Sequence, residues 1–129
     1  MNYEAISVII AAIANSILGG IWYTVLENRW LKAWKLNKES LKSKDPKPYL
    51  IAFIGSLWAS YGLFLIIKHI NPKNIEELLT IAIGSWLFIL VGLSAKHYAF
   101  ARVKFEAFII DYFLDLVGIT LMSFIIWSY

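Results

Sequence analysis

The sequence contains no cysteine and few charged residues. Cysteine is absent from all 129 residues, which excludes disulfides, thiolate metal sites and a cysteine nucleophile and removes the usual indicator of redox compartment. Charged residues make up only 16% of the chain, whereas about 25% is usual in soluble domains. A soluble domain of this length needs a polar surface, so the shortage of charge argues against one.

What the sequence has instead is long apolar blocks. Hydrophobic residues reach 60% and the mean hydropathy is +0.65. Four blocks have the roughly 20 residues that a helix needs to cross a bilayer core, namely 5–26, 49–67, 75–95 and 107–127. Lipid cannot satisfy open backbone groups, so such spans are helices or strands of a closed barrel. The blocks lack the alternation of barrel strands. We therefore predict one all-α domain over residues 1–129, an integral membrane bundle of four transmembrane helices.

The first block is predicted to be a retained span. Ala12-Ile13-Ala14 has the small-x-small pattern of a signal-peptide cleavage site. However, the start of the chain, Met1-Asn2-Tyr3-Glu4, lacks a basic region, and the apolar run continues past Ala14.

The basic residues predict the orientation. Ten of the twelve Lys and Arg lie in the first and third connections, 27–48 and 96–106, which share one side of the membrane if the spans number four. The positive-inside rule places that side in the cytoplasm and both termini outside. We expect a multi-pass protein of the cell membrane, specifically a bacterial inner membrane. Because the net charge of +3 is concentrated in these short connections, no nucleic-acid partner is predicted.

The first connection is predicted to hold a short amphipathic helix. Trp30, Leu31 and Trp34 share one helical face, while Lys32, Lys35 and Lys38 supply a basic side. Such a helix is expected to lie on the inner membrane surface, with its lysines near anionic headgroups. Asp45-Pro46-Lys47-Pro48 then ends any helix and opens the second span.

Asp111 and Asp115 are the main candidates for a binding site. They lie four residues apart in the fourth span, so they share a helix face that we expect to look into the protein. Asp115 is about 12 Å into the span, where a carboxylate costs about 2.5–3.5 kcal/mol. Two close carboxylates in a low dielectric suit a cation site or a proton relay.

A structural interpretation of the two aspartates stays open beside the functional one. Asp111 is shallow enough to pair with a basic residue of the third connection, and Asp115 could be protonated and hydrogen-bonded within the bundle. The possible partners of Asp111 are Lys96, Arg102 and Lys104, and those of Asp115 are Asn15, Ser56, Ser60 and Ser85.

Four further residues complete the candidate binding set: Asn15, Trp22, Tyr23 and His97. Asn15 and Trp22 share a helix face and could build a ligand site with Asp111. The structural alternative for Asn15 is a helix-to-helix hydrogen bond, worth about 0.6 kcal/mol on average. Trp22 and Tyr23 are also typical interface anchors, and His97 is expected at the inner edge, in solvent or near Asp111. No metal-ligand spacing occurs, and no cofactor or catalytic residue is predicted.

Several motifs resemble a known family. They are Leu18-Gly19-Gly20-Ile21-Trp22-Tyr23, Trp30, Pro48-Tyr49, Ile110-Asp111 and Leu116-Val117-Gly118. In this order they resemble the bacterial membrane family of domain of unknown function 1761. The resemblance implies a small four-span protein of unassigned activity and marks Trp22, Tyr23 and Trp30. This chain has Asp115 where the resemblance leads us to expect a histidine one turn after the last-span aspartate.

Two functions follow as hypotheses. The first is a small homo-oligomeric channel or transporter for a cation or proton, with an acidic site inside the membrane. The second is a non-catalytic scaffold, subunit or lipid-binding protein. A homo-oligomer is expected because four spans in so short a chain leave much helix surface uncovered. An enzyme is not expected, since no nucleophile-base pair is visible in the sequence.

Overall fold

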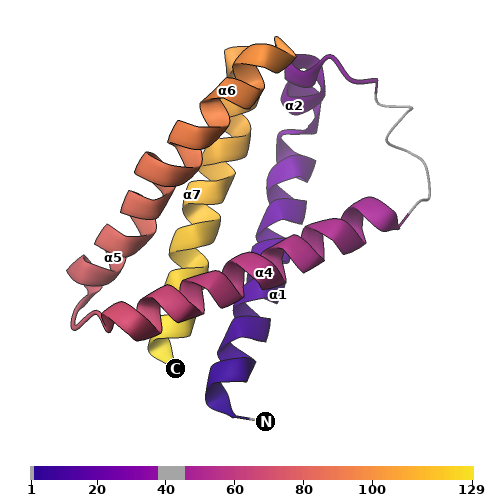
Figure 1. The fold of residues 1–129 in the computed structure, drawn as a ribbon. Helices are drawn as coiled ribbons and strands as arrows, with labels where there is room; N and C mark the ends of the chain where they lie inside the picture. Colours follow the sequence, from indigo (N-terminus) through magenta and orange to yellow (C-terminus); the bar gives the residue numbers. More distant parts are fainter. Residues whose placement is uncertain (1, 38–45) are drawn as a thin grey trace.

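The computed structural model describes residues 2–37 and 46–129, which form a bundle of helices (Figure 1). The elements are α1 (Tyr3–Val25), α2 (Glu27–Trp34), α4 (Lys47–Ile70), α5 (Ile75–Gly84), the π-helical segment η1 (Ser85–Leu90), α6 (Val91–Ala101) and α7 (Phe105–Ser128). Because α5, η1 and α6 run on as one helix, four helices are long and apolar enough to cross a membrane. The predicted all-α bundle, with four helices of the length and apolar composition that a membrane span needs, is confirmed for the described residues.

The third span is longer than predicted. It ends at Ala101 rather than Ala95, so Lys96 and His97 lie on helix α6 and the connection to α7 is only Arg102–Lys104. Arg102 ends the helix in the left-handed conformation, with φ 55°. The prediction ended the span at the first polar residues, Lys96 and His97. However, long polar side chains at a helix end can extend toward the membrane surface while the helix continues.

The ends of the helices follow from their cap residues. Asn2 accepts a hydrogen bond from the Ala5 backbone N–H (2.8 Å) at the start of α1. At the start of α5, the Asn74 side chain accepts from the Glu77 N–H (2.9 Å), and the Glu77 carboxylate accepts from the Lys73 N–H (2.6 Å). These bonds satisfy backbone donors that a helix start leaves open. Helix α4 begins at Lys47, two residues before the predicted start of the second span at Tyr49, so Pro48 lies in its first turn. Lys38 and Asp45 lie outside the described residues.

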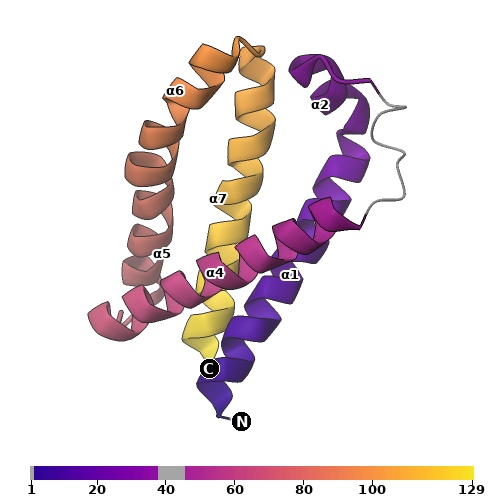
Figure 2. The ribbon, with the colours of Figure 1, turned by 45° about the vertical axis from the view of Figure 1, so that its right-hand side comes forward.

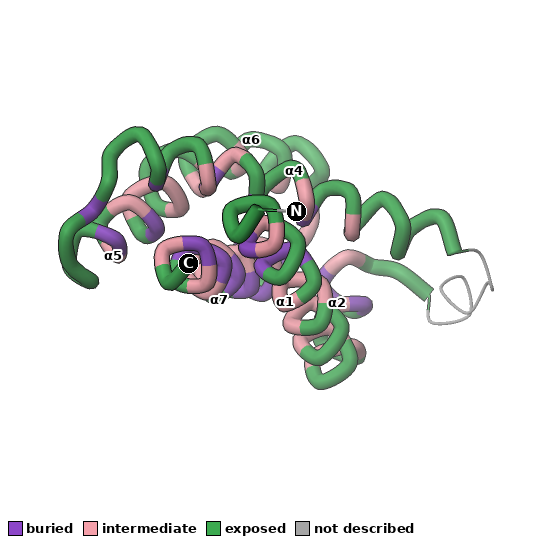
Figure 3. Tube along the Cα trace, turned by 90° about the horizontal axis from the view of Figure 1, so that it is seen from below, coloured by how far each residue is buried: buried purple, intermediate pink, exposed green. Residues whose placement is uncertain are grey.

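Helix α7 is the centre of the bundle. It contacts α1, α2, α4, α5, η1 and α6, and buried residues recur along its whole length (Figure 3). Helix α4 runs obliquely across α1 and α7, and both termini lie at the same end (Figures 1 and 2). The first part of α4 leaves the bundle, so that Tyr49 and Ile51 are 78% and 68% exposed.

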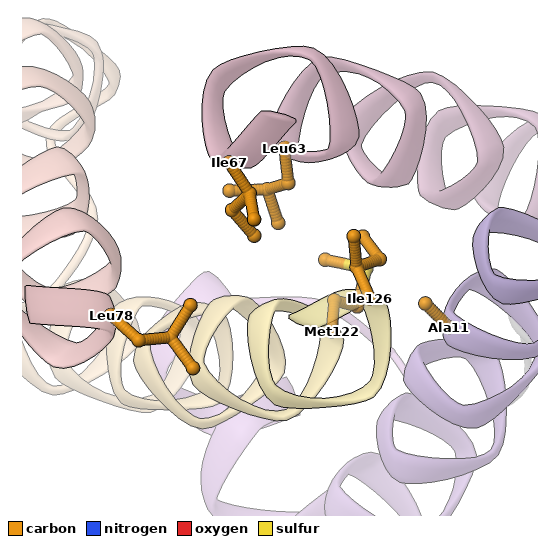
Figure 4. Packing of buried hydrophobic residues seen from close by; sticks show 6 residues of the cluster. All are labelled: Ala11, Leu63, Ile67, Leu78, Met122 and Ile126. Atoms are coloured by element: carbon orange, nitrogen blue, oxygen red, sulfur yellow. The ribbon is translucent and has the colours of Figure 1, made fainter. Parts of the chain in front are cut away.

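A small apolar core closes the end of the bundle near the termini. It consists of Ala11, Leu63, Ile67, Leu78, Met122 and Ile126 (Figure 4). These side chains come from α1, α4, α5 and α7. Lipid gives helices little hydrophobic reason to associate, so close packing through small residues carries more of the association. Ala11, Ala12 and Ser60 are accordingly 0% exposed. The opposite end of the bundle contains buried Leu31, Ala33, Ala107 and Ile110 and, beside them, a cluster of polar and aromatic contacts.

Candidate functional site

Asp111 lies at the centre of a cluster of aromatic hydrogen-bond donors. Its Oδ1 accepts from the Tyr23 hydroxyl (2.7 Å) and the Trp30 indole N–H (2.9 Å). Its Oδ2 accepts from the Trp34 indole N–H (3.1 Å) and the Tyr98 hydroxyl (2.7 Å). We call these five residues the Asp111 hub. A carboxylate offers about four acceptor sites, so the hub uses the full acceptor capacity of Asp111.

The hub joins four helices that are distant in sequence. Tyr23 comes from the last turn of α1, Tyr98 from α6 and Asp111 from α7. Trp30 and Trp34 are four residues apart on α2, which brings both indoles to one face. Helix α2 is held in place by a backbone bond from the Lys104 N–H to the Ala33 carbonyl (3.3 Å).

The aromatic rings of the hub also pack against one another. Ring centroids are 5.2 Å apart for Tyr23 and Trp30, 6.3 Å for Trp30 and Trp34, and 5.4 Å for Trp34 and Tyr98. Phe108 continues this row at 5.2 Å from Tyr98. These separations lie in the favourable range for aromatic pairs. The rings partly cover the carboxylate, which strengthens its hydrogen bonds because the local dielectric is low.

Asp115 is placed very differently from Asp111. It lies one turn further along α7 and is half-buried, yet its carboxylate has no hydrogen bond or ion pair with any residue that the structure describes. The predicted partners are engaged elsewhere, since Asn15 donates to Ser56 (2.9 Å) and Ser60 donates to the Val8 carbonyl (2.7 Å). The structural interpretation of Asp115 as an acid hydrogen-bonded to Asn15, Ser56, Ser60 or Ser85 is therefore wrong for the described residues, since none of these four side chains bonds to it.

The predicted ion pairs of Asp111 are also wrong. Neither Lys96, Arg102 nor Lys104 reaches it, because the helical extension of α6 keeps the first two at the surface and four aromatic donors already occupy the carboxylate. His97 is exposed, and its neighbour Tyr98 makes the contact with Asp111 instead, since adjacent residues of a helix point about 100° apart. The shared face of the two aspartates does look into the protein, because Gly118 and Met122 on the same stripe are buried.

Asn15 and Trp22 lie in the interface of α1 with α7, about two turns apart. The Trp22 indole donates to the carbonyl of Ile110 (3.0 Å). Asn15 makes the helix-to-helix hydrogen bond that the sequence allowed, to Ser56 of α4, and it also touches α7 at Gly118. Each side chain has its own partner, so the structure does not bring Asn15, Trp22 and Asp111 together into one ligand site.

Sequence reasoning did not connect three donors of the hub, Trp30, Trp34 and Tyr98, with Asp111, although the family resemblance marked Trp30. Trp30 and Trp34 were assigned to the membrane surface, and Tyr98 was placed in a loop. A usable signal was the spacing of Trp30 and Trp34, which matches one helix turn beside a span that carries an aspartate. Within the described part of the chain, no group of three or more His, Asp or Glu could hold a metal ion.

Four helices are long and apolar enough to cross a membrane, which indicates a multi-pass helical membrane protein. The Asp111 carboxylate on the fourth of them connects it to the first and the third through Tyr23 and Tyr98. The chain belongs to the family described as "Protein of unknown function (DUF1761)", whose model matches residues 6–127. The resemblance inferred from the Trp22, Tyr23 and Trp30 pattern is thereby confirmed, and the whole Asp111 hub lies within the match. Comparisons with curated proteins and with solved structures gave no match.

Proposed function

We propose that the protein binds a small cation or a proton at Asp115 and works, without catalysis, as a small homo-oligomeric channel or transporter. The observation that supports this proposal is the carboxylate of Asp115 in the fourth span, which has no hydrogen bond or ion pair with residues 2–37 and 46–129. At 1.5 Å per residue from Phe105, it lies about 15 Å along α7, halfway through a core about 30 Å thick. A carboxylate there costs about 2.5–3.5 kcal/mol, and a bound cation or proton offsets that cost.

The two aspartates have different roles in this proposal: Asp111 is structural and Asp115 binds the ligand. Asp111 has no acceptor capacity left for a ligand, since four donors of the chain occupy it. It therefore positions α7 and contributes negative potential about 6 Å along the helix from Asp115. Asp115 keeps both carboxylate oxygens available for an ion.

A homo-oligomer fits this arrangement because Asp115 alone is an incomplete cation site. Six or more oxygen ligands are usual for a hard cation such as Ca²⁺ or Mg²⁺, and one aspartate supplies at most two. The first part of α4 leaves the bundle with Tyr49, Leu50 and Ile51 all exposed, which offers a surface on which a second copy can pack. A proton needs no such completion.

The decisive variant is Asp115→Asn, assayed for proton or monovalent-cation flux in liposomes. We expect flux to fall by at least tenfold while thermal stability does not fall and oligomer mass is unchanged, because the substitution removes a costly charge and no bond to any described residue. Glu76→Gln is the matched control, since Glu76 is an exposed acid in the first turn of α5. Undiminished flux in Asp115→Asn would refute the site.

We further propose that the hub end of the bundle faces the cytoplasm of a bacterial cell, with both termini outside. The connections at this end carry most of the basic residues, which agrees with the positive-inside rule. A fluorescent protein that matures only in the cytoplasm is expected to stay dark when fused to the C-terminus. The same reporter inserted into the connection between α2 and α4 is expected to be bright, and the reverse pattern overturns this orientation.

The alternative is a non-catalytic scaffold, subunit or lipid-binding protein. It is favoured by the Asp111 hub, because all acceptor sites of this intramembrane carboxylate are used by hydrogen bonds within the chain. Such a carboxylate has a structural role and needs no ligand. Wild-type protein that conducts no cation or proton in liposomes, but co-purifies with a second polypeptide, would select this alternative and remove the first.

A further inference from the structure

A cavity of about 220 Å³ lies beside the Asp111 hub. Its lining residues are Ala95, Tyr98, Ala99, Val103, Lys104, Phe105 and Phe108. They come from α6, from the short connection after it and from the first turn of α7. Whole small-molecule ligands usually occupy about 300–1,000 Å³. The cavity is therefore too small for such a ligand and suits one part of a larger molecule.

The walls of the cavity combine apolar surface with one positive charge. Two alanines leave a shallow depression on α6, and Phe105 and Phe108 stack at 5.7 Å to form the opposite wall. Lys104 is the charged lining residue. A group that fits has an apolar portion for the ring wall and a negative charge for the ammonium.

The surroundings of the cavity reinforce the positive charge. Lys96 and Arg102 are exposed on the same end of α6. The nearest acid in sequence, Glu106, forms an ion pair with Arg29 of α2 (3.3 Å), and the single negative charge of Asp111 is outnumbered by the charges of Lys96, Arg102 and Lys104. The local field thus favours an anion over a cation, the opposite of the preference at Asp115.

We infer that this cavity is a binding site for an anionic phospholipid. The phosphate lies against Lys104, and the start of an acyl chain follows the wall formed by Ala95, Ala99 and the two phenylalanines. An aromatic and basic setting of this kind is typical of the membrane interface, where anionic headgroups attract lysine. The site requires only that the chain lies in a bilayer, and it does not depend on ion binding at Asp115.

The bound lipid also stabilises the hub. Tyr98 lines the cavity with its ring and donates its hydroxyl to Asp111, and Phe108 packs on Tyr98 from the same side. A lipid that covers these rings binds the folded state and not the unfolded one, so it raises the unfolding temperature as its concentration increases.

The test measures unfolding temperature and native mass of the full chain in detergent with added phosphatidylglycerol. Phosphatidylcholine and inorganic phosphate are the comparison probes. We expect phosphatidylglycerol to stabilise the protein and remain bound in the mass spectrum, phosphatidylcholine to do so weakly, and phosphate to have no effect. Lys104→Gln should weaken the apparent affinity for phosphatidylglycerol about fivefold, the effect of one lysine near a charged headgroup.

Two further variants separate a built site from general attraction. Ala99→Phe fills the cavity without changing charge and is expected to abolish the retained lipid. Lys96→Gln removes the same charge from a nearby residue that does not line the cavity, so it lowers only the surrounding potential and is expected to weaken the affinity much less than Lys104→Gln does. Should Ala99→Phe fail to fold, the comparison of Lys104→Gln with Lys96→Gln decides alone.

The inference is overturned by any of three results. The first is equal loss of lipid in Lys96→Gln and Lys104→Gln, which would indicate a diffuse basic surface. The second is stabilisation by inorganic phosphate alone, which would indicate a soluble anion. The third is a dimer mass that disappears in Ala99→Phe while lipid binding is unchanged, which would indicate that a second copy of the chain occupies the cavity.

Discussion

Asp111→Asn is expected to destabilise the protein strongly, although asparagine and aspartate have nearly the same shape. The reason lies in the two indoles of the hub. Trp30 donates to one carboxylate oxygen and Trp34 donates to the other. An indole N–H can only donate, whereas a tyrosine hydroxyl can rotate and accept. In either orientation of the asparagine amide, its NH₂ group takes the place of the carboxylate oxygen that one of the two indoles needs as acceptor. That indole N–H then faces another donor and loses its hydrogen bond.

The expected loss is about 2 kcal/mol of unfolding free energy, since an unsatisfied buried donor costs about 1–3 kcal/mol. Unfolding of the purified protein in mixed micelles by a denaturing detergent measures it. Asp115→Asn is the matched control, because it makes the same chemical change one turn away on a side chain without a partner among the described residues. We expect this control to be at least as stable as the wild type, because asparagine removes a half-buried carboxylate charge.

A double substitution distinguishes the donor conflict from a general loss of packing. Replacing the conflicting indole with phenylalanine removes the surplus donor, so Asp111→Asn combined with Trp30→Phe or with Trp34→Phe should be no less stable than Asp111→Asn alone. The two single Trp variants measure the packing cost and complete the cycle. Equal stability of Asp111→Asn and Asp115→Asn would contradict the structural role assigned to the hub.

The four spans could be predicted because the bilayer sets a simple requirement. Each apolar block had to be long enough to cross the core and had to satisfy its own backbone, so length and continuity were sufficient. The boundary at Ala101 was missed because Lys96 and His97 are polar, and polarity at a membrane edge does not distinguish a loop from the last turns of a helix. The short helix Glu27–Trp34 exists, while its position on the membrane surface stays a prediction.

The site could be predicted only in part. Asp111 and Asp115 stood out because an acid in a span is costly whatever surrounds it. Their partners could not be predicted, because Trp and Tyr are enriched at membrane interfaces for reasons unrelated to hydrogen bonding with an acid. Tyr23 is 88 residues from Asp111 in sequence, and nothing local marks that pairing. Asp111 accepts four hydrogen bonds, whereas Asp115 has no partner in the part of the chain that the structure describes, and this difference arises from the fold.

Gly118→Ala is the second substitution for which we expect a large effect. Gly118 is buried where α1, α4 and α7 converge, and a Cβ added there would overlap the side-chain oxygen of Asn15. Asn15 is not free to move aside, since its amide donates to Ser56 (2.9 Å). The alanine methyl must therefore break that bond or push α1 away from α7. Overpacking of this kind costs about 1–3 kcal/mol.

The glycines elsewhere in the spans supply the matched controls. A Cβ at Gly62 or Gly92 meets nothing within 4 Å, so alanine there should be neutral or stabilising by up to about 1 kcal/mol through its better helix propensity. Unfolding in mixed micelles compares the three alanine variants under one condition. If Gly118→Ala is as stable as Gly62→Ala, the close contact of α1 with α7 at Asn15 is absent from the folded protein.

Asn15→Ala tests the same contact from the other side. Alone it should destabilise slightly, because it removes one interhelical hydrogen bond worth about 0.6 kcal/mol. Combined with Gly118→Ala it should recover stability, since the obstructing oxygen is gone. Gly118 and Asp111 are seven residues, or about 10 Å, apart on α7. The losses from Gly118→Ala and Asp111→Asn should therefore add to within about 0.5 kcal/mol, whereas a larger coupling would mean that the hub positions α1 along the whole length of α7.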